Sequence, residues 1–127
     1  MGCRHMKKRE RLRTRKDFVT VYRRGRAWAN QFLVLRALPS DLPHHRCGFV
    51  VSKRVGKAVV RNRLKRRLRE ALRPLIVQPG WDLILLARPP AAGASYHELR
   101  QAIVNLLSRA RLLDGADPVR QQAGKER

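Results

Sequence analysis

The sequence predicts an α+β fold, a single-domain α/β sandwich of about four strands and three helices in the order α-β-β-(β)-α-β-α. Two patterns carry this prediction. Three segments repeat apolar residues at the spacing of a helix, and the segments between them are short apolar runs bounded by turn residues, which is typical of strands. A chain of 127 residues with 43% hydrophobic content also suits one domain around one core.

We expect this domain to span residues 7–114. The first six residues, MGCRHM, precede the patterned part of the chain and are expected to be a vector-derived remnant or a disordered start. Residues 115–127 contain few apolar side chains, which predicts a disordered tail. With Cys3 set aside, Cys47 is left alone and is expected to be a buried apolar residue, so no internal disulfide forms and the reducing cytoplasm fits.

The first helix is expected over residues 14–24. Thr14 and Asp17 resemble a capping box at its start, and Gly25 supplies its end. Its apolar face is predicted to contain Phe18, Val21 and Tyr22.

Two segments with strand character follow, at 29–38 and 46–53. They are separated by PSDLPHH, whose Pro, Ser and Asp favour a turn, and together they predict an antiparallel hairpin. In the first segment, Phe32, Val34, Arg36 and Leu38 are expected on one face, and Leu33, Leu35 and Ala37 on the other. Both faces are mostly apolar, so we expect helices to cover the sheet.

A second helix is expected from about residue 58 to Arg73, because the residue before Pro74 avoids the helical region. Its predicted buried stripe is Val60, Leu64, Leu68, Ala71 and Leu72. A polar ridge well away from that stripe is predicted to contain Asn62, Arg66, Arg69 and Arg73.

A short buried strand is expected next, at about 81–88, between Pro and Gly residues. The last helix is predicted from Ser95 to Leu113. Ser95 and Glu98 form a capping box at its start, and Gly115 ends it.

The charge of the chain points to its partner. Thirty basic residues against nine acidic ones give a net charge of +21 at pH 7, a self-repulsion that a polyanion such as RNA or DNA relieves. An anionic membrane is the weaker alternative, because no apolar run approaches the roughly 18 residues of a membrane span and no secretion signal follows the basic start.

Basic residues are concentrated between Val51 and Arg73, in VSKRVGKAVVRNRLKRRLREALR. Most of them are arginines, whose planar guanidinium group holds a phosphate by two contacts and stacks on bases. Ser52, Lys53, Arg54 and Lys57 extend the positive charge around the amino end of the helix, where backbone amides add to an anion site. The amide of Asn62 has open alternatives: it fixes arginine side chains, binds a nucleotide, or satisfies a neighbouring backbone group.

The stretch SKRVGKAVVRNRLKRR, from Ser52 to Arg67, resembles the arginine-asparagine-arginine signature of the bacterial ribonuclease P protein subunit. The start KKRERLRTRKDFVTVYRRG, the two strands, WDLILLAR with its Pro-containing loop and the capped last helix are similar to that family in order and spacing, over roughly residues 6–113. The resemblance implies a cytoplasmic, monomeric subunit that pairs 1:1 with a catalytic RNA. It assists that RNA in the endonucleolytic removal of the 5′ leader from precursor tRNA.

The resemblance also assigns binding roles and one topological feature. Binding of the RNA subunit is implied by position for the signature-helix residues Arg61, Asn62, Arg63, Lys65, Arg66 and Arg69. From their charge at the amino end of that helix, Lys53, Arg54 and Lys57 are expected to bind the same RNA. Binding of the single-stranded leader, in a cleft between the first helix and the sheet, is implied for Phe18, Tyr22, Val34 and Arg36. The strand–helix–strand unit at 46–88 is expected to cross over in the left-handed sense, against the usual rule.

Two of these residues have a plainer interpretation. From periodicity alone, Phe18 and Tyr22 are typical core residues of an amphipathic helix, and only the resemblance favours stacking on unpaired bases. The family often has an aromatic residue where this chain has Arg36, so we expect a phosphate contact or an arginine–base stack there.

No group of residues predicts catalysis by the chain itself. A protein ribonuclease needs two positioned acid–base groups or carboxylates around a metal, whereas His44 and His45 share a turn and the carboxylates are scattered. The resemblance implies that the RNA subunit binds most of the magnesium and performs the chemistry, and that the protein alone binds no metal. A basic structural RNA-binding protein of the ribosomal type is the alternative, which composition and charge do not distinguish.

Overall fold

The structure is a computed structural model that describes residues 11–12 and 14–113. The predicted start at 1–6 and tail at 115–127 lie outside the described residues, as do the expected ends of the domain. The elements in chain order are α1 (Arg15–Arg24), β1 (Arg26–Ala29), β2 (Leu33–Pro39), β3 (Arg46–Val50), α2 (Ala58–Leu72), β4 (Trp81–Ala87), the 3-10 helix η2 (Pro89–Gly93) and α3 (Tyr96–Arg109). Three α-helices and a four-stranded mixed sheet confirm the predicted α+β class.

The strand order is β1-β2-β4-β3. Strand β2 is antiparallel to both β1 and β4, and β3 is parallel to β4. The predicted hairpin between residues 29–38 and 46–53 is therefore wrong, because β4 lies between those segments. Strand β4 suits this central place, since Leu83, Ile84 and Leu85 are buried on both of its faces. The left-handed sense of the β3–α2–β4 crossover stays a prediction of the resemblance.

Strand β1 is separated from β2 by a turn at Asn30, so the predicted strand at 29–38 is in fact the end of β1, a turn and β2. The Asn30 Oδ1 atom accepts hydrogen bonds from the backbone N–H groups of Phe32 (3.1 Å) and Leu33 (3.0 Å). An asparagine side chain that binds nearby backbone in this way is a common turn former.

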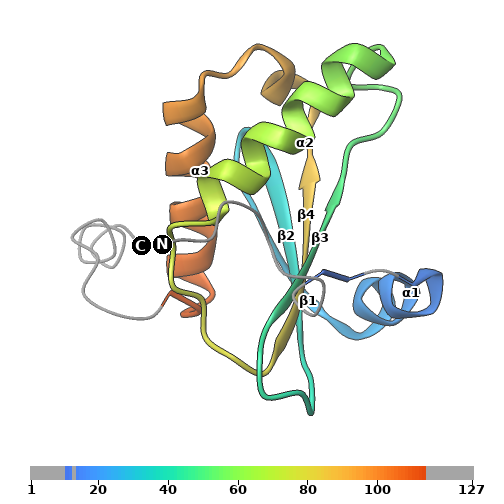
Figure 1. Cartoon of the computed structure of the whole chain (residues 1–127), viewed down its shortest axis with the longest axis vertical. Helices are drawn as coiled ribbons and strands as arrows, with labels where there is room; N and C mark the ends of the chain where they lie inside the picture. Colours follow the sequence, from blue (N-terminus) through green and yellow to red (C-terminus); the bar gives the residue numbers. More distant parts are fainter. Residues whose placement is uncertain (1–10, 13, 114–127) are drawn as a thin grey trace.

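The sheet separates two apolar layers, with α1 on one face and α2 and α3 on the other (Figure 1). The main core lies under α2 and α3 and includes Leu33, Leu35, Leu83, Leu85, Leu64, Leu68, Leu99 and Ile103. A smaller cluster under α1 is formed by Leu12, Val21 and Ile84, with Phe18, Leu38, Val50 and Leu86 packed against it. The alternation predicted for β2 is thus confirmed from Leu33 onward. Phe32 precedes the strand and packs against the main core, contrary to its predicted face.

The buried stripe predicted for α2 is largely confirmed. Leu64, Leu68, Ala71 and Leu72 are buried, whereas Val60, one turn from the start, is only half-buried. Arg73 caps the helix as its last turn ends before Pro74.

The capping box predicted for α3 is present, since the Glu98 N–H donates to the Ser95 Oγ and the Ser95 N–H donates to the Glu98 carboxylate. The helix ends at Arg109 and not at Leu113. Arg111 has a φ of 61°, and the Leu112 carbonyl accepts a hydrogen bond from the Gln78 N–H at 2.8 Å. The chain therefore leaves the helix to pair with the segment after α2; the predicted stop at Gly115 lies outside the described residues.

Candidate RNA-binding surface

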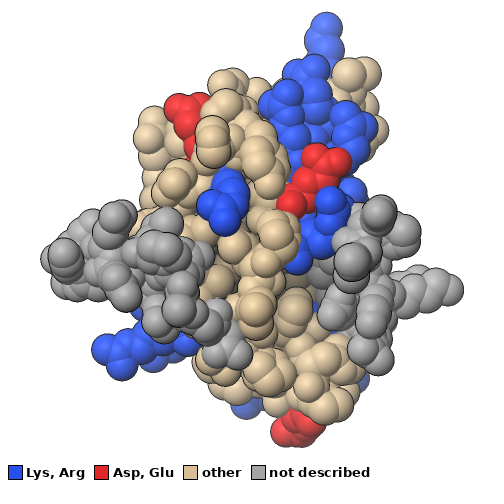
Figure 2. Space-filling model, turned by 60° about the vertical axis from the view of Figure 1, so that its left-hand side comes forward, with Lys and Arg blue, Asp and Glu red and all other residues tan. Residues whose placement is uncertain are grey.

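Helix α2 holds a row of cations at the surface because its other side is fixed in the core. The side chains of Lys53, Arg54, Lys57, Asn62, Arg63 and Arg66 are exposed, and those of Arg61, Lys65 and Arg69 are half-exposed. Within the described part of the chain, Arg63 and Arg66 form no ion pair. Figure 2 shows one dense group of Lys and Arg at the upper right, with acidic residues beside it and other basic residues scattered over the rest of this face. All nine predicted RNA-subunit residues thus have exposed or half-exposed side chains, on the loop before α2 and on the helix itself.

The amino end of α2 is open to an anion. Its N-cap residue, Lys57, makes no side-chain capping bond, and the first turn contains no acidic residue. The first N–H groups of a helix have no partner inside the helix, so they attract phosphate. The Arg61 Nε donates to the Gly56 carbonyl at 3.1 Å, which holds this side chain against the loop that leads into the helix.

A small pocket of about 160 Å³ joins the cationic helix to the first helix along the edge of β3. Lys65 and Arg69 line it from α2 and Phe18 lines it from α1, together with Arg11, Leu12, Cys47, Gly48 and Phe49. The Arg69 Cζ lies 5.8 Å from the centroid of the Phe49 ring, a cation–π distance. Two residues predicted to bind the RNA subunit, Lys65 and Arg69, therefore line the same pocket as Phe18, which is predicted to bind the leader.

Gly48 is the reason that Phe18 reaches this edge. A Cβ atom at Gly48 would lie 2.4 Å from the Phe18 Cζ, so the ring packs directly on the backbone of β3. Phe18 is half-buried as a result, and it belongs in part to the small core under α1.

Tyr22 and Arg36 form a stack beside that core. The Arg36 Cζ lies 5.0 Å from the Tyr22 ring centroid, and the Arg36 Nη1 donates to the Tyr22 backbone carbonyl at 2.9 Å. Tyr22 is 37% exposed, so its ring is not sealed in the interior. Burial raises the pKa of the Tyr22 hydroxyl, and the charge of Arg36 partly opposes that effect.

An open apolar strip continues from this stack across the sheet. Ala29, Val34, Leu86 and Val50 are neighbours by strand register and lie on the face that carries α1. Each is exposed or half-exposed. Sequence reasoning found Val34 but missed Ala29, Leu86 and Val50. The alternation in β4 would have placed Leu86 beside Val34 had the strand order been known.

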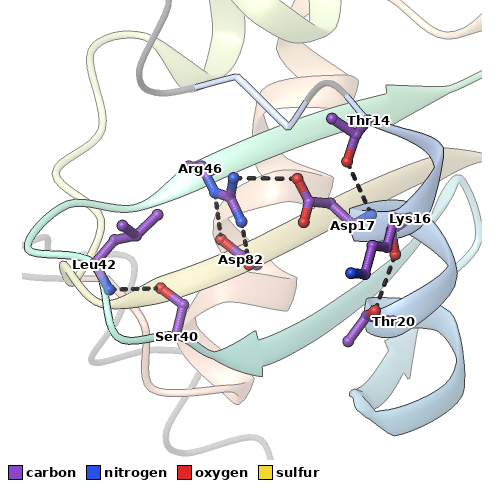
Figure 3. A network of polar contacts seen from close by, with 8 residues as sticks. All are labelled: Thr14, Lys16, Asp17, Thr20, Ser40, Leu42, Arg46 and Asp82. Carbon is purple, nitrogen blue, oxygen red and sulfur yellow. Dashed lines mark hydrogen bonds and ion pairs between the residues drawn. The ribbon is translucent and has the colours of Figure 1, made fainter.

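Arg46 is a further residue that sequence reasoning missed (Figure 3). Its Nε and Nη2 donate to the two Asp82 carboxylate oxygens at 2.9 and 2.8 Å, and its Nη1 donates to Asp17 Oδ2 at 3.2 Å. The hydrogen bond to Asp82 is the main cause that raises the pKa of Arg46 above its ordinary value. The Asp17 carboxylate is thus drawn toward the sheet, while Thr14 Oγ1 still accepts from the Asp17 N–H. Arg46 therefore fastens the first turn of α1 to β3 and β4.

Other chemical features of the described residues are limited. They contain no group of three or more His, Cys, Asp or Glu side chains placed to hold a metal ion. Cys47 is buried as predicted, and burial raises the pKa of its thiol. Across residues 11–12 and 14–113, no helix is both long and apolar enough to cross a membrane.

Comparison with known proteins agrees with this arrangement. Residues 6–111 match the family described as Ribonuclease P. The chain is 46% identical over 114 residues to the ribonuclease P protein component of Roseiflexus castenholzii, covering 87% of this chain and 93% of that protein. It is 40% identical over 111 residues to that of Listeria innocua, covering 85% of this chain and 93% of its relative.

Solved structures are similar as well. The RNase P protein of Staphylococcus aureus matches with a TM-score of 0.76 at 29% identity, over 83% of this chain and 98% of that one. The RNase P protein of Thermotoga maritima matches with a TM-score of 0.72 at 31% identity, over 79% of this chain and 96% of that one. The sequence signature, the fold and these matches agree, and the chain belongs to the ribonuclease P protein family.

Proposed function

We propose that this chain is the accessory protein of a ribonuclease P holoenzyme, and that it binds the RNA subunit through α2 and the single-stranded 5′ leader of precursor tRNA through the face that carries α1. The observation that carries the proposal is the partly exposed Tyr22–Arg36 stack at the border of the open apolar strip, on the sheet face opposite the arginine-rich helix.

Helix α2 suits a folded RNA better than a protein partner. Its exposed cations are mostly arginines, and its uncapped amino end adds backbone donors. A phosphate backbone uses all of these donors, and its binding releases counterions.

The α1 face suits an unpaired strand. Tyr22 offers a ring on which any base stacks, Arg36 adds a charge beside it, and the strip of Ala29, Val34, Leu86 and Val50 offers apolar area without base-reading groups. Such a surface holds leaders of different sequence, as a general processing enzyme requires.

The chemistry belongs to the RNA subunit in this proposal. Hydrolysis of the phosphodiester bond uses magnesium ions, which the proposal assigns mainly to that RNA. The protein acts in the cytoplasm, 1:1 with the RNA, by raising the affinity for leader-bearing substrate.

The test is reconstitution with a bacterial ribonuclease P RNA at low magnesium concentration, with removal of the 5′ leader followed over time. Stimulation by the protein is expected. If the protein binds the RNA without stimulating cleavage, a structural RNA-binding role of the ribosomal type replaces the proposal.

A further inference from the structure

A second groove lies beside the β1–β2 turn, on the side of that turn away from the open apolar strip. It has a volume of about 600 Å³ and runs between the β1–β2 turn and α3, where Gln31, Phe32, His97, Gln101, Ala102 and Asn105 line it. We call it the α3 groove. None of these residues belongs to the surfaces described above.

The walls of the α3 groove are held in place by hydrogen bonds. Asn30, which also lines it, donates from Nδ2 to the Ala102 carbonyl and to Asn105 Oδ1, both at 3.1 Å. The same side chain closes the turn, so the turn and α3 form one rigid unit. A preformed site of this kind costs little ordering when a ligand binds.

The lining has the chemistry of a nucleobase site. Phe32 offers an aromatic side chain, and the amides of Gln31, Gln101 and Asn105 offer both donors and acceptors, as the edges of bases do. Asn105 Oδ1 is already used by Asn30, which leaves the Asn105 Nδ2 as a donor. Glu98, at one end of the groove, is engaged in the cap of α3.

Two arginines stand beside the same turn. The Arg109 Nη1 donates to the Ala29 carbonyl at 2.8 Å, and the Arg88 Nη1 donates to the Asn30 carbonyl at 2.6 Å. Both side chains are exposed, so their other N–H groups remain for phosphate. No Lys or Arg is among the described residues that line the groove itself. A base therefore fits inside, with its phosphates at the edge.

The groove also continues the surface proposed for the leader. Ala29 and Val34, at one end of the open strip, flank the turn whose Gln31 and Phe32 line the α3 groove. We propose that the α3 groove binds an unpaired base of the 5′ leader, farther from the cleavage site than the nucleotides held on the strip. This inference rests on the proposed function.

The test uses the holoenzyme reconstituted from the full chain and two precursor tRNAs. One has a leader cut back to the nucleotides beside the cleavage site, and the other has a leader several nucleotides longer. Replacement of both exposed amides, Gln31→Ala with Gln101→Ala, is expected to weaken binding of the long-leader substrate by at least roughly two- to tenfold, the range for one lost hydrogen bond. The short-leader substrate is expected to be unchanged.

A second variant tests whether the selective loss comes from a lost contact with the base and not from misfolding. Phe32→Leu keeps an apolar side chain against the core but removes the aromatic ring, and it is expected to give the same selective loss. An equal loss on both substrates, or no loss on either, overturns the proposal; the second result is also what a protein occupant of the groove would produce. Tyr22→Ala distinguishes failure of this inference from failure of the proposed function. If Tyr22→Ala leaves both substrates unaffected, the assignment of the leader to the α1 face is wrong.

Discussion

Arg36 lies over the ring of Tyr22 at 5.0 Å and donates a hydrogen bond to the carbonyl of the same residue at 2.9 Å. Each side chain therefore fixes the position of the other. The pair links α1 to β2 at the border of the open strip, where an unpaired strand would stack on the ring and meet the guanidinium group.

Tyr22→Ala is expected to weaken the binding of leader-bearing precursor tRNA by about 1–3 kcal/mol, the usual value of one base stacked on an aromatic side chain. Binding of mature tRNA should not change, because it has no leader. Equilibrium binding to the reconstituted holoenzyme measures both. Tyr96→Ala, at another exposed tyrosine, is the control variant. Its binding is measured with a short-leader precursor tRNA, for which no change is expected. Equal losses for precursor and mature tRNA would contradict the assignment.

The raised pKa of Tyr22 makes a prediction at high pH. Because the fold favours the neutral phenol, the stabilisation is complete below the ordinary pKa of 10.0 and is lost as the pH rises through the higher folded-state value. Between about pH 9 and pH 11, the free energy of unfolding in urea should fall more for the original protein than for Tyr22→Phe. Parallel curves for the two proteins would show that Tyr22 does not titrate in this way.

Arg46→Ala is expected to destabilise the protein by about 3 kcal/mol, because it leaves the carboxylate of Asp82 buried without its partner. Asp17→Asn should cost less than about 1 kcal/mol, since its bond to Arg46 is single and partly exposed. Urea unfolding measures both values. A loss for Asp17→Asn as large as that for Arg46→Ala would place the main contact on α1 and not on Asp82.

Arg66→Ala should reduce the salt dependence of binding to the RNA subunit. Each phosphate contact contributes about 0.7–0.9 to the slope of log affinity against log salt concentration, so the slope should become shallower by about that amount. Arg100→Ala, on α3, is the control, with no change expected. A weaker affinity at an unchanged slope would mean that Arg66 touches a base or a sugar and not a phosphate.

Gly48→Ala should cost about 1–3 kcal/mol of stability, because the new Cβ would lie 2.4 Å from the Phe18 Cζ and would push the ring off β3. Gly93→Ala is a matched control, since nothing lies within 4 Å of the Cβ it would add. Thermal unfolding compares the two variants. Equal stability of both would show that Phe18 moves aside without cost.

Short sequence patterns predicted those structural features whose physical cause lies within a few neighbouring residues. Leucines at helical spacing predicted the buried side of α2, and therefore which of its residues face solvent. The capping residues Thr14 and Ser95 marked the starts of α1 and α3 within a residue. The end of α3 escaped prediction, because Leu112 and Leu113 leave the helix to pack beside the distant Gln78 and Val77.

By itself, therefore, the sequence determined the three helices, the approximate positions of β2, β3 and β4, the cationic side of α2 and the family to which the chain is similar, because periodicity, caps and charge act within a few residues. Only the tertiary structure decided that β4 lies between β2 and β3, that Phe18 rests on Gly48 beside Lys65, and that Arg46 ties α1 to the sheet. Strand partners and side-chain pairs of this kind depend on which distant surfaces bury best together, and no short stretch of sequence contains that comparison.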